Sequence, residues 1–357
     1  MGTLTVPARQ ESHLSLRPVP WRKMAWVVWR QHRLALAGVV ALFGVAGAYL
    51  LITGLQMYND YAAVTACRPA ASDICVRAAT DFLAATDFLA AHAPGAGITF
   101  ALLQMIPALL GAFLGAPLIA REFETGTFRY AFTQGFGRTR WAIAKLVPLA
   151  VVVAVAAGLF SLAVSWYFAP LNGAGDDNGP LYPTIFDLLG VAFAAWTLAA
   201  FAIGALAGVL IRRVIPAMVA TIGAWAGLAF VAALFLRPHY MAPLTTGDPN
   251  VVAHGDWVMS QVWTQSGQPV TLDMLNRTLG AVDVRAITAQ LFQPGPSTPA
   301  NLGDPVQYLI QHGYTYLTTY EPASRFWTYQ FIEGGWLIVL SLLLIATTVW
   351  LVRRRAS

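Results

Sequence analysis

The chain has 357 residues, of which 57% are hydrophobic and only 11% are charged, with a mean hydropathy of +0.59 and a formal net charge of +5. This composition excludes a soluble protein of the same size and indicates an all-α polytopic membrane protein. The basic residues flank apolar segments and form no stripe with interleaved aromatic residues, so we expect them to orient the chain in a bilayer rather than to bind nucleic acid.

Six apolar segments are long enough to cross a bilayer as helices, since a hydrocarbon core of about 30 Å needs roughly 20 residues. They lie at residues 34–53, 98–119, 145–168, 185–211, 215–236 and 336–352. Lys and Arg collect on the side of a membrane that is not translocated. With the N-terminus in the cytoplasm, 16 of the 22 Lys and Arg residues fall on the cytoplasmic side and 6 fall outside. We therefore predict six transmembrane helices with both termini in the cytoplasm.

The region before the first span, residues 1–33, is predicted to be a polar tail followed by a short helix at 21–33. Its basic side chains share an arc of about 100°, while apolar side chains fill much of the remainder. These basic residues are Arg22, Lys23, Arg30 and Arg33. Such a helix fits the cytoplasmic interface of the membrane and would enter the first span at an angle. The alternative is a simple charged extension of the first span.

The first outer loop contains the two cysteines of the chain, Cys67 and Cys75. An oxidising exterior and the short spacing favour a disulfide between them. Two free thiols are the alternative. A metal site is disfavoured because no His and no second cysteine pair lies at ligand spacing.

Three spans contain a G-x-x-x-G pair, a spacing that lets two helices approach closely. The pairs are Gly111 and Gly115, Gly204 and Gly208, and Gly223 and Gly227. They indicate helix packing either within one chain or between two chains. The second span also holds Gln104 and Pro107, which either line a transport pathway or belong to a packed interior.

The cytoplasmic loop at residues 120–145 is a long polar interruption between two apolar spans. Its charged residues are Arg121, Glu122, Glu124, Arg129, Arg138, Arg140 and Lys145. Carboxylates stand before Gly126, and guanidinium groups follow a glycine-rich turn. We predict two short polar helices joined by a bend, which would present fixed charges to a soluble partner.

Residues 237–330 are predicted to form an extracytoplasmic subdomain of α+β or irregular structure, because the hydropathy falls there and the stretch is long enough for a small fold. We expect a strand at 257–264 with a turn at Ser266 and Gly267, helices at 272–292 and a loop at 294–305. The last span and a basic cytoplasmic tail follow at 331–357.

The sequence contains no phosphate-binding loop, so the chain is not expected to hydrolyse ATP or to bind a cofactor itself. The hydrolase motifs G-x-S-x-G and H-E-x-x-H are also absent. Asp187 and Glu333 lie near the ends of spans, and we interpret them as interfacial acids that reach water rather than as proton relays.

The cytoplasmic loop resembles the inner loop of type-two ATP-binding-cassette (ABC) exporter permeases in its Glu122, Gly126, Thr127, Gly135, Arg138 and Lys145. In that family a Glu precedes Gly-Thr, then a turn, an Arg and a Lys that opens the next span. Gln134 and Gly135 stand here where the family usually has Thr-Pro, and glycine still supplies a turn. The segment before the last span, residues 319–335, is similar to that of actinobacterial members. The resemblance covers these two stretches and the six-span layout.

The resemblance implies a bacterial plasma-membrane permease that works as a homodimer or with a related permease. Two separate ATPase subunits would bind ATP and Mg. The loop residues implied to couple to them are Glu122, Glu124, Gly126, Thr127, Arg138, Arg140 and Lys145. The spacing to Gly126 favours Glu122 over Glu124 as the contact. Because no span carries strong buried charge, we expect an apolar or amphipathic substrate.

Two alternatives come from other functional classes. A membrane enzyme acting on lipid or cell-wall precursors would need reactive outer residues, and the candidates are His239, Asp256, His312 and Glu321. A sensor or immunity subunit would instead bind an extracellular ligand through residues 237–330 without transporting it.

Overall fold

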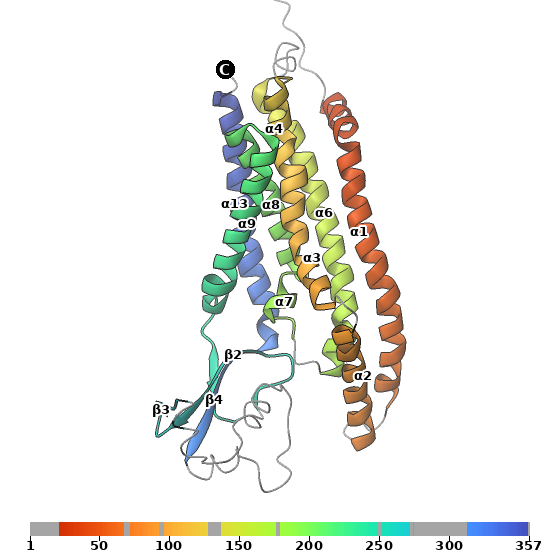
Figure 1. The fold of residues 1–357 in the computed structure, drawn as a ribbon, viewed down its shortest axis with the longest axis vertical. Helices are drawn as coiled ribbons and strands as arrows, with labels where there is room; N and C mark the ends of the chain where they lie inside the picture. The colour runs from red at the N-terminus through yellow and green to blue at the C-terminus, as the bar shows by residue number, and fades with distance from the viewer. Residues whose placement is uncertain are drawn as a thin grey trace, which may run out of the picture.

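The computed structural model describes residues 21–67, 72–92, 96–127, 137–175, 179–248, 251–271, 274 and 313–355. The described residues include six helical segments that are long and apolar enough to cross a membrane, which confirms the six-span prediction. They stand side by side as a bundle, with a small β-sheet at one end (Figure 1). We call that end the sheet end, and the opposite end, where the C-terminal helix finishes, the basic end.

The first span belongs to α1 (Trp21–Ala66), a single helix of 46 residues. The separate interfacial helix expected at 21–33 is therefore wrong, and the charged extension of the first span is what the structure contains. No Gly or Pro occurs between Trp21 and Ala37, so nothing in this stretch interrupts the helix. At 1.5 Å per residue the helix is about 69 Å long, so it projects well beyond a hydrocarbon core of about 30 Å.

A disulfide joins α1 to the helix that follows it at the sheet end. Cys67 comes directly after α1, and Cys75 lies in the first turn of α2 (Asp73–His92). The two Cα atoms are 5.5 Å apart, and Cys75 is buried. The disulfide closes the connection between a long span and a shorter peripheral helix (Figure 1).

The second span is built from three consecutive segments. They are α3 (Ala96–Leu110), a π-helical turn η1 (Gly111–Gly115) and α4 (Ala116–Thr125). The third span is α6 (Arg138–Ala174). The fifth consists of α9 (Val214–Val231) and the π-helical turn η2 (Ala232–Leu236), followed by the short 3-10 helix η3 (Arg237–His239). The sixth lies within α13 (Phe326–Arg355).

The fourth span, α8 (Gly190–Ile211), occupies the centre of the bundle and contacts α3, η1, α4, α6, α9 and α13. It begins five residues later than the predicted start at 185. A short helix, α7 (Pro183–Phe186), precedes it, and Gly190 has a positive φ of 58° that separates the two. Small residues make this central position possible, because they let neighbouring backbones come close to α8.

Two of the three glycine pairs pack within the chain. A methyl group on Gly204 of α8 would lie 2.2 Å from the carbonyl oxygen of Gly111. One on Gly208 would lie 2.5 Å from the carbonyl oxygen of Ala116. The third pair differs, since no described residue lies within 4 Å of the positions that methyl groups on Gly223 and Gly227 of α9 would take. The first two pairs therefore join the second span to the fourth, and the third lies on an open face.

The sheet is antiparallel, with the strand order β1-β4-β2-β3. Its strands are β1 (Leu244–Thr246), β2 (Trp257–Gln265), β3 (Gln268–Pro269) and β4 (Tyr314–Glu321). The predicted strand at 257–264 and its turn are confirmed: Ser266 and Gly267 both have positive φ, as a two-residue hairpin turn requires. β4 was not predicted. The helices expected at 272–292 and the loop at 294–305 lie outside the described residues, apart from Met274.

Candidate functional site

The loop residues singled out from the sequence gather where α4 ends and α6 begins, at the basic end (Figure 1). α4 ends at Thr125 and is followed by Gly126, whose φ of 70° is a left-handed conformation that glycine adopts without a steric penalty. The Thr125 hydroxyl donates to the carbonyl of Arg121 over 2.8 Å and lies 3.0 Å from the hydroxyl of Thr127. The Gly-Thr motif thus terminates α4 and fixes the direction in which the loop leaves it.

Glu122 of α4 forms an ion pair with Lys145 of α6. The two side chains are 18% and 5% exposed, so the pair is largely withdrawn from water. The ammonium group also lies 4.6 Å from the centroid of the Trp141 ring, one turn earlier on α6. Removing one partner of such a pair leaves a buried charge without compensation. The contact therefore fastens the helix before the loop to the helix after it.

Glu124 points to a different neighbour. Its carboxylate accepts a hydrogen bond of 3.0 Å from the backbone N–H of Val214, the first residue of α9. An acidic group is favourable there because the N-terminus of a helix carries partial positive charge and unsatisfied N–H groups. The preceding residue on α4, Phe123, lies under the guanidinium of Arg212, 5.6 Å from its ring centroid. α4 is thus held to the turn between α8 and α9.

The two acids that the sequence left as alternatives therefore both have partners inside the chain. Arg138 and Arg140 are partly buried in the first turn of α6. Residues 128–136, which include Arg129 and Gly135, lie outside the described residues. Direct contact between these side chains and a soluble partner remains a prediction.

His32, which sequence analysis did not single out, adds α1 to this junction. It interacts electrostatically with Lys145, and its buried Nε2 atom has no hydrogen-bond partner in the part of the chain that the structure describes. No local motif marks this residue, because it comes near Lys145 only once α1 and α6 have packed together. The junction of α1, α4 and α6 is thus a polar cluster at the end of an apolar bundle.

A family model described as "ABC-2 membrane transporter related" matches residues 39–237, which is more than half of the chain. The chain belongs to this family. The matched region contains α4, the loop and α6, so the family likeness includes the junction described above. No curated protein sequence and no solved structure matches the chain. The protein is therefore a membrane-embedded transport permease, and permeases of this family generally work with an ATPase subunit.

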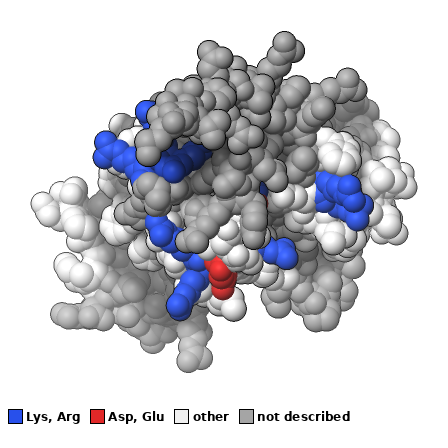
Figure 2. Space-filling view, turned by 90° about the horizontal axis from the view of Figure 1, so that it is seen from above, with Lys and Arg blue, Asp and Glu red and all other residues white. Residues whose placement is uncertain are grey.

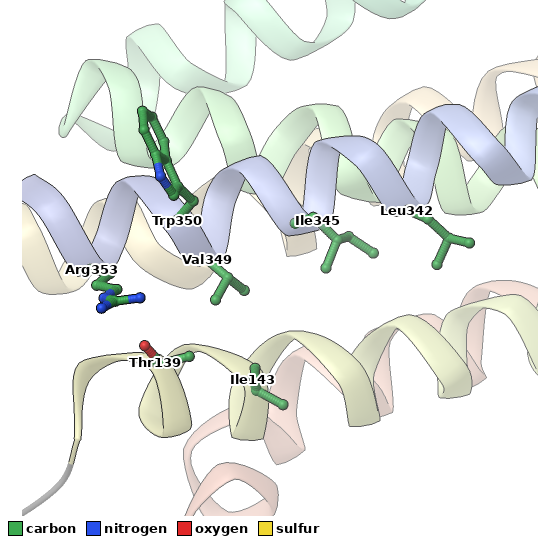
Figure 3. A pocket seen from close by; sticks show the side chains of 8 residues that line it. Thr139, Ile143, Leu342, Ile345, Val349, Trp350 and Arg353 are labelled. Atoms are coloured by element: carbon green, nitrogen blue, oxygen red, sulfur yellow. The ribbon is translucent and has the colours of Figure 1, made fainter.

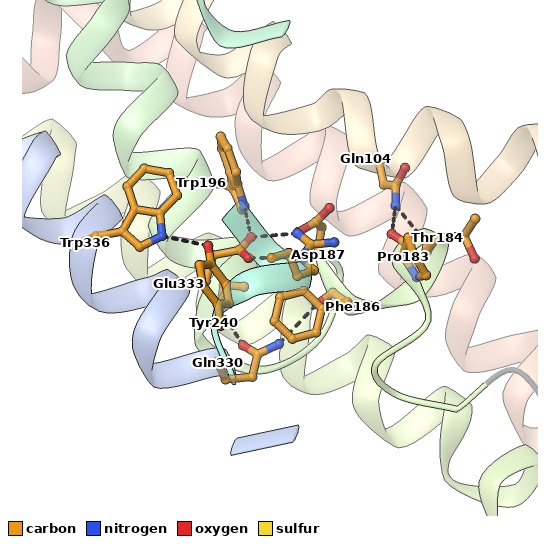
Figure 4. Close-up of polar contacts among 12 residues, drawn as sticks. Gln104, Pro183, Thr184, Phe186, Asp187, Trp196, Tyr240, Gln330, Glu333 and Trp336 are labelled. Atoms are coloured by element: carbon orange, nitrogen blue, oxygen red, sulfur yellow. Dashed lines mark hydrogen bonds and ion pairs between the residues drawn. The ribbon is translucent and has the colours of Figure 1, made fainter. Parts of the chain in front are cut away.

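The permease has a second polar cluster at the sheet end, shown in Figure 4. Glu333 of α13 accepts hydrogen bonds from Arg237 at 2.7 and 3.0 Å and from the indole N–H of Trp196 at 2.8 Å. Arg237 also forms an ion pair with Asp187, between α7 and α8. Two carboxylates thus share one guanidinium. Partial burial raises the pKa of Asp187 to about 7; Arg237 opposes this rise and the neighbouring Glu333 adds to it.

The prediction that both acids reach water is wrong for Glu333, which is 0% exposed, whereas Asp187 is 29% exposed. Arg237, expected in the outer subdomain, is 1% exposed at the end of the fifth span, so the expectation that no span carries strong buried charge is wrong for Arg237 and Glu333. Gln330 completes the cluster, because its amide accepts from the N–H of Ala192 and donates to a carbonyl at the end of α7. The cluster fastens the starts of α8 and α13 to the end of the fifth span.

Gln104 and Pro107, the candidate pathway residues of the permease, both lie in α3. The amide of Gln104 donates to the carbonyl oxygen of Thr184 over 2.7 Å and thereby braces α7 against α3 (Figure 4). Pro107 lies inside α3, one turn before η1. It removes one helical N–H donor at that point. Gln104 is half-buried and serves this packing contact, and a role of Gln104 and Pro107 in a transport pathway stays a prediction.

The outer residues proposed for an enzyme are also held by the fold. Asp256 accepts from the N–H groups of Ala253 and Ala323, and buried Glu321 pairs with Arg325 at 2.8 Å. His239 contacts a carbonyl of its own helical turn, and His312 lies outside the described residues. In the described ranges no three His, Cys, Asp or Glu residues are grouped to hold a metal ion. Asp256 and Glu321 anchor the sheet to the 3-10 helix η5 (Ala323–Arg325), which leads into α13.

Proposed function

We propose that this permease is the membrane-spanning subunit of an ABC exporter in a bacterial plasma membrane and moves an apolar or amphipathic substrate out of the cell. ATP and Mg bind to a separate ATPase subunit, present in two copies, and no cofactor binds to this chain. Family membership supports the transport role. The observation that carries the coupling is the ion pair between Glu122 and Lys145 across the loop.

The ion pair provides a route for mechanical coupling. A partner that pushes the loop displaces α4 and α6 together, because the pair holds the two helices on either side of it. α4 continues through η1 into α3, and α6 runs unbroken to the sheet end. Closure of two ATPase subunits would therefore tilt the second and third spans as one unit. The π-helical turn and Pro107 are the points where the second span can bend.

The proposed orientation places the basic end in the cytoplasm. Lys and Arg side chains are spread over the described part of this end, while Asp and Glu are sparse (Figure 2). Such a bias is typical of the cytoplasmic side of a membrane protein. The disulfide between Cys67 and Cys75 supports the same orientation, because it lies at the opposite end and disulfides persist in oxidising compartments.

A second copy of the chain is proposed to pack on the open face of α9. Within the described part of the chain no atom lies within 4 Å of a methyl group placed on Gly223 or Gly227, and Val219 and Phe230 are 66% and 60% exposed. Small residues at this spacing allow close approach of a second helix. Gly223→Ile should reduce the dimer fraction measured by cross-linking in native membranes, while Gly47→Ile, an equally open glycine on α1, should not. An equal reduction of the dimer fraction by Gly223→Ile and Gly47→Ile would rule out α9 as the interface.

The function is tested by purifying the affinity-tagged permease from its native membranes in mild detergent. We expect an ATPase subunit to be retained and Glu122→Ala to reduce the linked ATPase activity. Thr347→Ala is the control, since this exposed hydroxyl bonds only to its own helix. The proposal is wrong if the tagged chain never retains an ATPase subunit and the Glu122→Ala change leaves the linked ATPase activity unaltered.

A further inference from the structure

An apolar groove runs between α6 and α13 near the basic end (Figure 3). Its volume is about 400 Å³. One wall carries Ile143 of α6, and the other carries Leu342, Ile345 and Val349 of α13. These side chains offer no polar atoms, so a fully polar ligand would lose its hydration here without compensation.

The end of the groove has a different chemistry. Arg353 and Thr139 lie opposite each other there, with the guanidinium of Arg353 directed across the gap (Figure 3). Arg353 is exposed and forms no ion pair with any described residue. Arg354 lies 4.4 Å from the ring centroid of Trp350, which also lines the groove. An apolar slot with a guanidinium and a hydroxyl at one end is complementary to an amphipathic anion.

The dimensions of the groove exclude a helix as its occupant. From Leu342 to Arg353 the axis of α13 advances about 16 Å, close to the roughly 15 Å that one leaflet contributes to the hydrocarbon core. The whole empty space of the groove, counted with its open side, is about 770 Å³, and over that length it gives a cross-section of about 48 Å². A disc of that area is about 8 Å across, narrower than the 10 Å or so of a helix with its side chains. The groove therefore accommodates a single hydrocarbon chain.

We propose that this groove binds one acyl chain of an anionic phospholipid, with the headgroup phosphate held by Arg353 and Thr139. Arginine suits this role because its planar guanidinium donates two parallel hydrogen bonds to a phosphate. The lipid would fill the space between the third and sixth spans and leave their contacts with α8 intact. The site itself does not depend on the transport proposal; only its assignment to the cytoplasmic leaflet rests on the proposed orientation.

The test is native mass spectrometry of the detergent-purified permease after adding phosphatidylglycerol or, separately, phosphatidylcholine. We expect phosphatidylglycerol to be retained preferentially and Arg353→Gln to reduce its retention about tenfold, since hydrogen bonds between charged groups contribute on the order of one decade of affinity or more. Ala346→Trp, which fills the apolar part, should reduce retention of both lipids.

Arg213→Gln is the matched control, because it removes the same charge from the turn before α9, away from the groove. Equal retention of the two lipids, or an equal loss from Arg213→Gln and Arg353→Gln, would overturn the proposal. Inorganic phosphate added as a competitor should not displace the lipid, and displacement would point to a phosphate site instead. None of these measurements requires the ATPase, so their failure is distinguishable from failure of the exporter proposal.

Discussion

The carboxylate of Glu122 and the ammonium of Lys145 meet although 23 residues separate them in the sequence. Because both are largely shielded from water, the pair fixes the distance between α4 and α6 at the point where the loop leaves each helix. This relationship holds the two helices together on either side of the loop.

Glu122→Gln should lower the free energy of unfolding by about 3–5 kcal/mol, because it leaves the buried ammonium of Lys145 without a countercharge. Thermal unfolding of the purified permease in detergent measures this loss. Glu124→Gln is the control and should cost only about 1 kcal/mol, since Glu124 is exposed and caps one helix. A loss from Glu122→Gln no larger than that of the control would contradict the role of the pair.

Gly204→Ala should destabilise the bundle by about 1–3 kcal/mol or prevent folding, because the added methyl group would lie 2.2 Å from the carbonyl oxygen of Gly111. Backbone, rather than a flexible side chain, occupies that space. The yield of monodisperse protein in size-exclusion chromatography and its thermal midpoint report the effect. Gly47→Ala has open space around it and should leave both unchanged or raise the midpoint slightly.

Asp187 should make the permease more stable at mildly acidic pH. Its pKa rises from an ordinary value of 3.8 to about 7, so the folded protein holds this proton more tightly than the unfolded chain does. Its contribution to stability therefore falls as the pH rises from about 4 to 7 and is constant above that range. Thermal midpoints between pH 5.5 and 7.5 should decline more for the unmodified permease than for Asp187→Asn. An equal decline of the thermal midpoint in the two proteins would show that Asp187 is not the group responsible.

Cys67 and Cys75 provide a test of orientation, since they are the only two cysteines in the chain. On intact cells, a membrane-impermeant reductant followed by an impermeant maleimide should label both residues. Labelling that appears only after the membrane is permeabilised would reverse the proposed orientation. Replacing both cysteines by serine should cost about 2–3 kcal/mol, as expected for releasing a short disulfide-closed loop.

The six spans and the first hairpin could be predicted because their signals are local. Twenty apolar residues in a row identify a span wherever it packs, and the alternating pattern from Trp257 followed by Ser266 and Gly267 identifies a strand and its turn. β4 was not predicted, although its Tyr- and Thr-rich sequence after Gly313 favours a strand. Its residues Tyr314 to Glu321 become a strand by pairing with β1 and β2, across a long stretch of intervening chain.

The polar clusters could not be predicted because their members come from distant elements. Arg237 lies 50 residues from Asp187 and 96 from Glu333, and each looks like an ordinary interfacial charge when read alone. The sequence singled out the loop residues as a group without pairing them, and the structure brings Glu122 and Lys145 together. Their pairing follows from the packing of two helices whose relative rotation no local pattern specifies.

That rotation traces back to the π-helical turn at Gly111–Gly115. A π-helical turn holds one residue more than an α-helical turn. It therefore rotates all later residues of the span about the helix axis by about 100°. α4 therefore presents a different side to its neighbours than a straight continuation of α3 would. Deleting the lipid-exposed Phe113 would restore regular helical phase and turn Glu122 away from Lys145. One extra residue in the middle of the second span thus sets the side of α4 on which Glu122 lies, and so whether it can pair with Lys145.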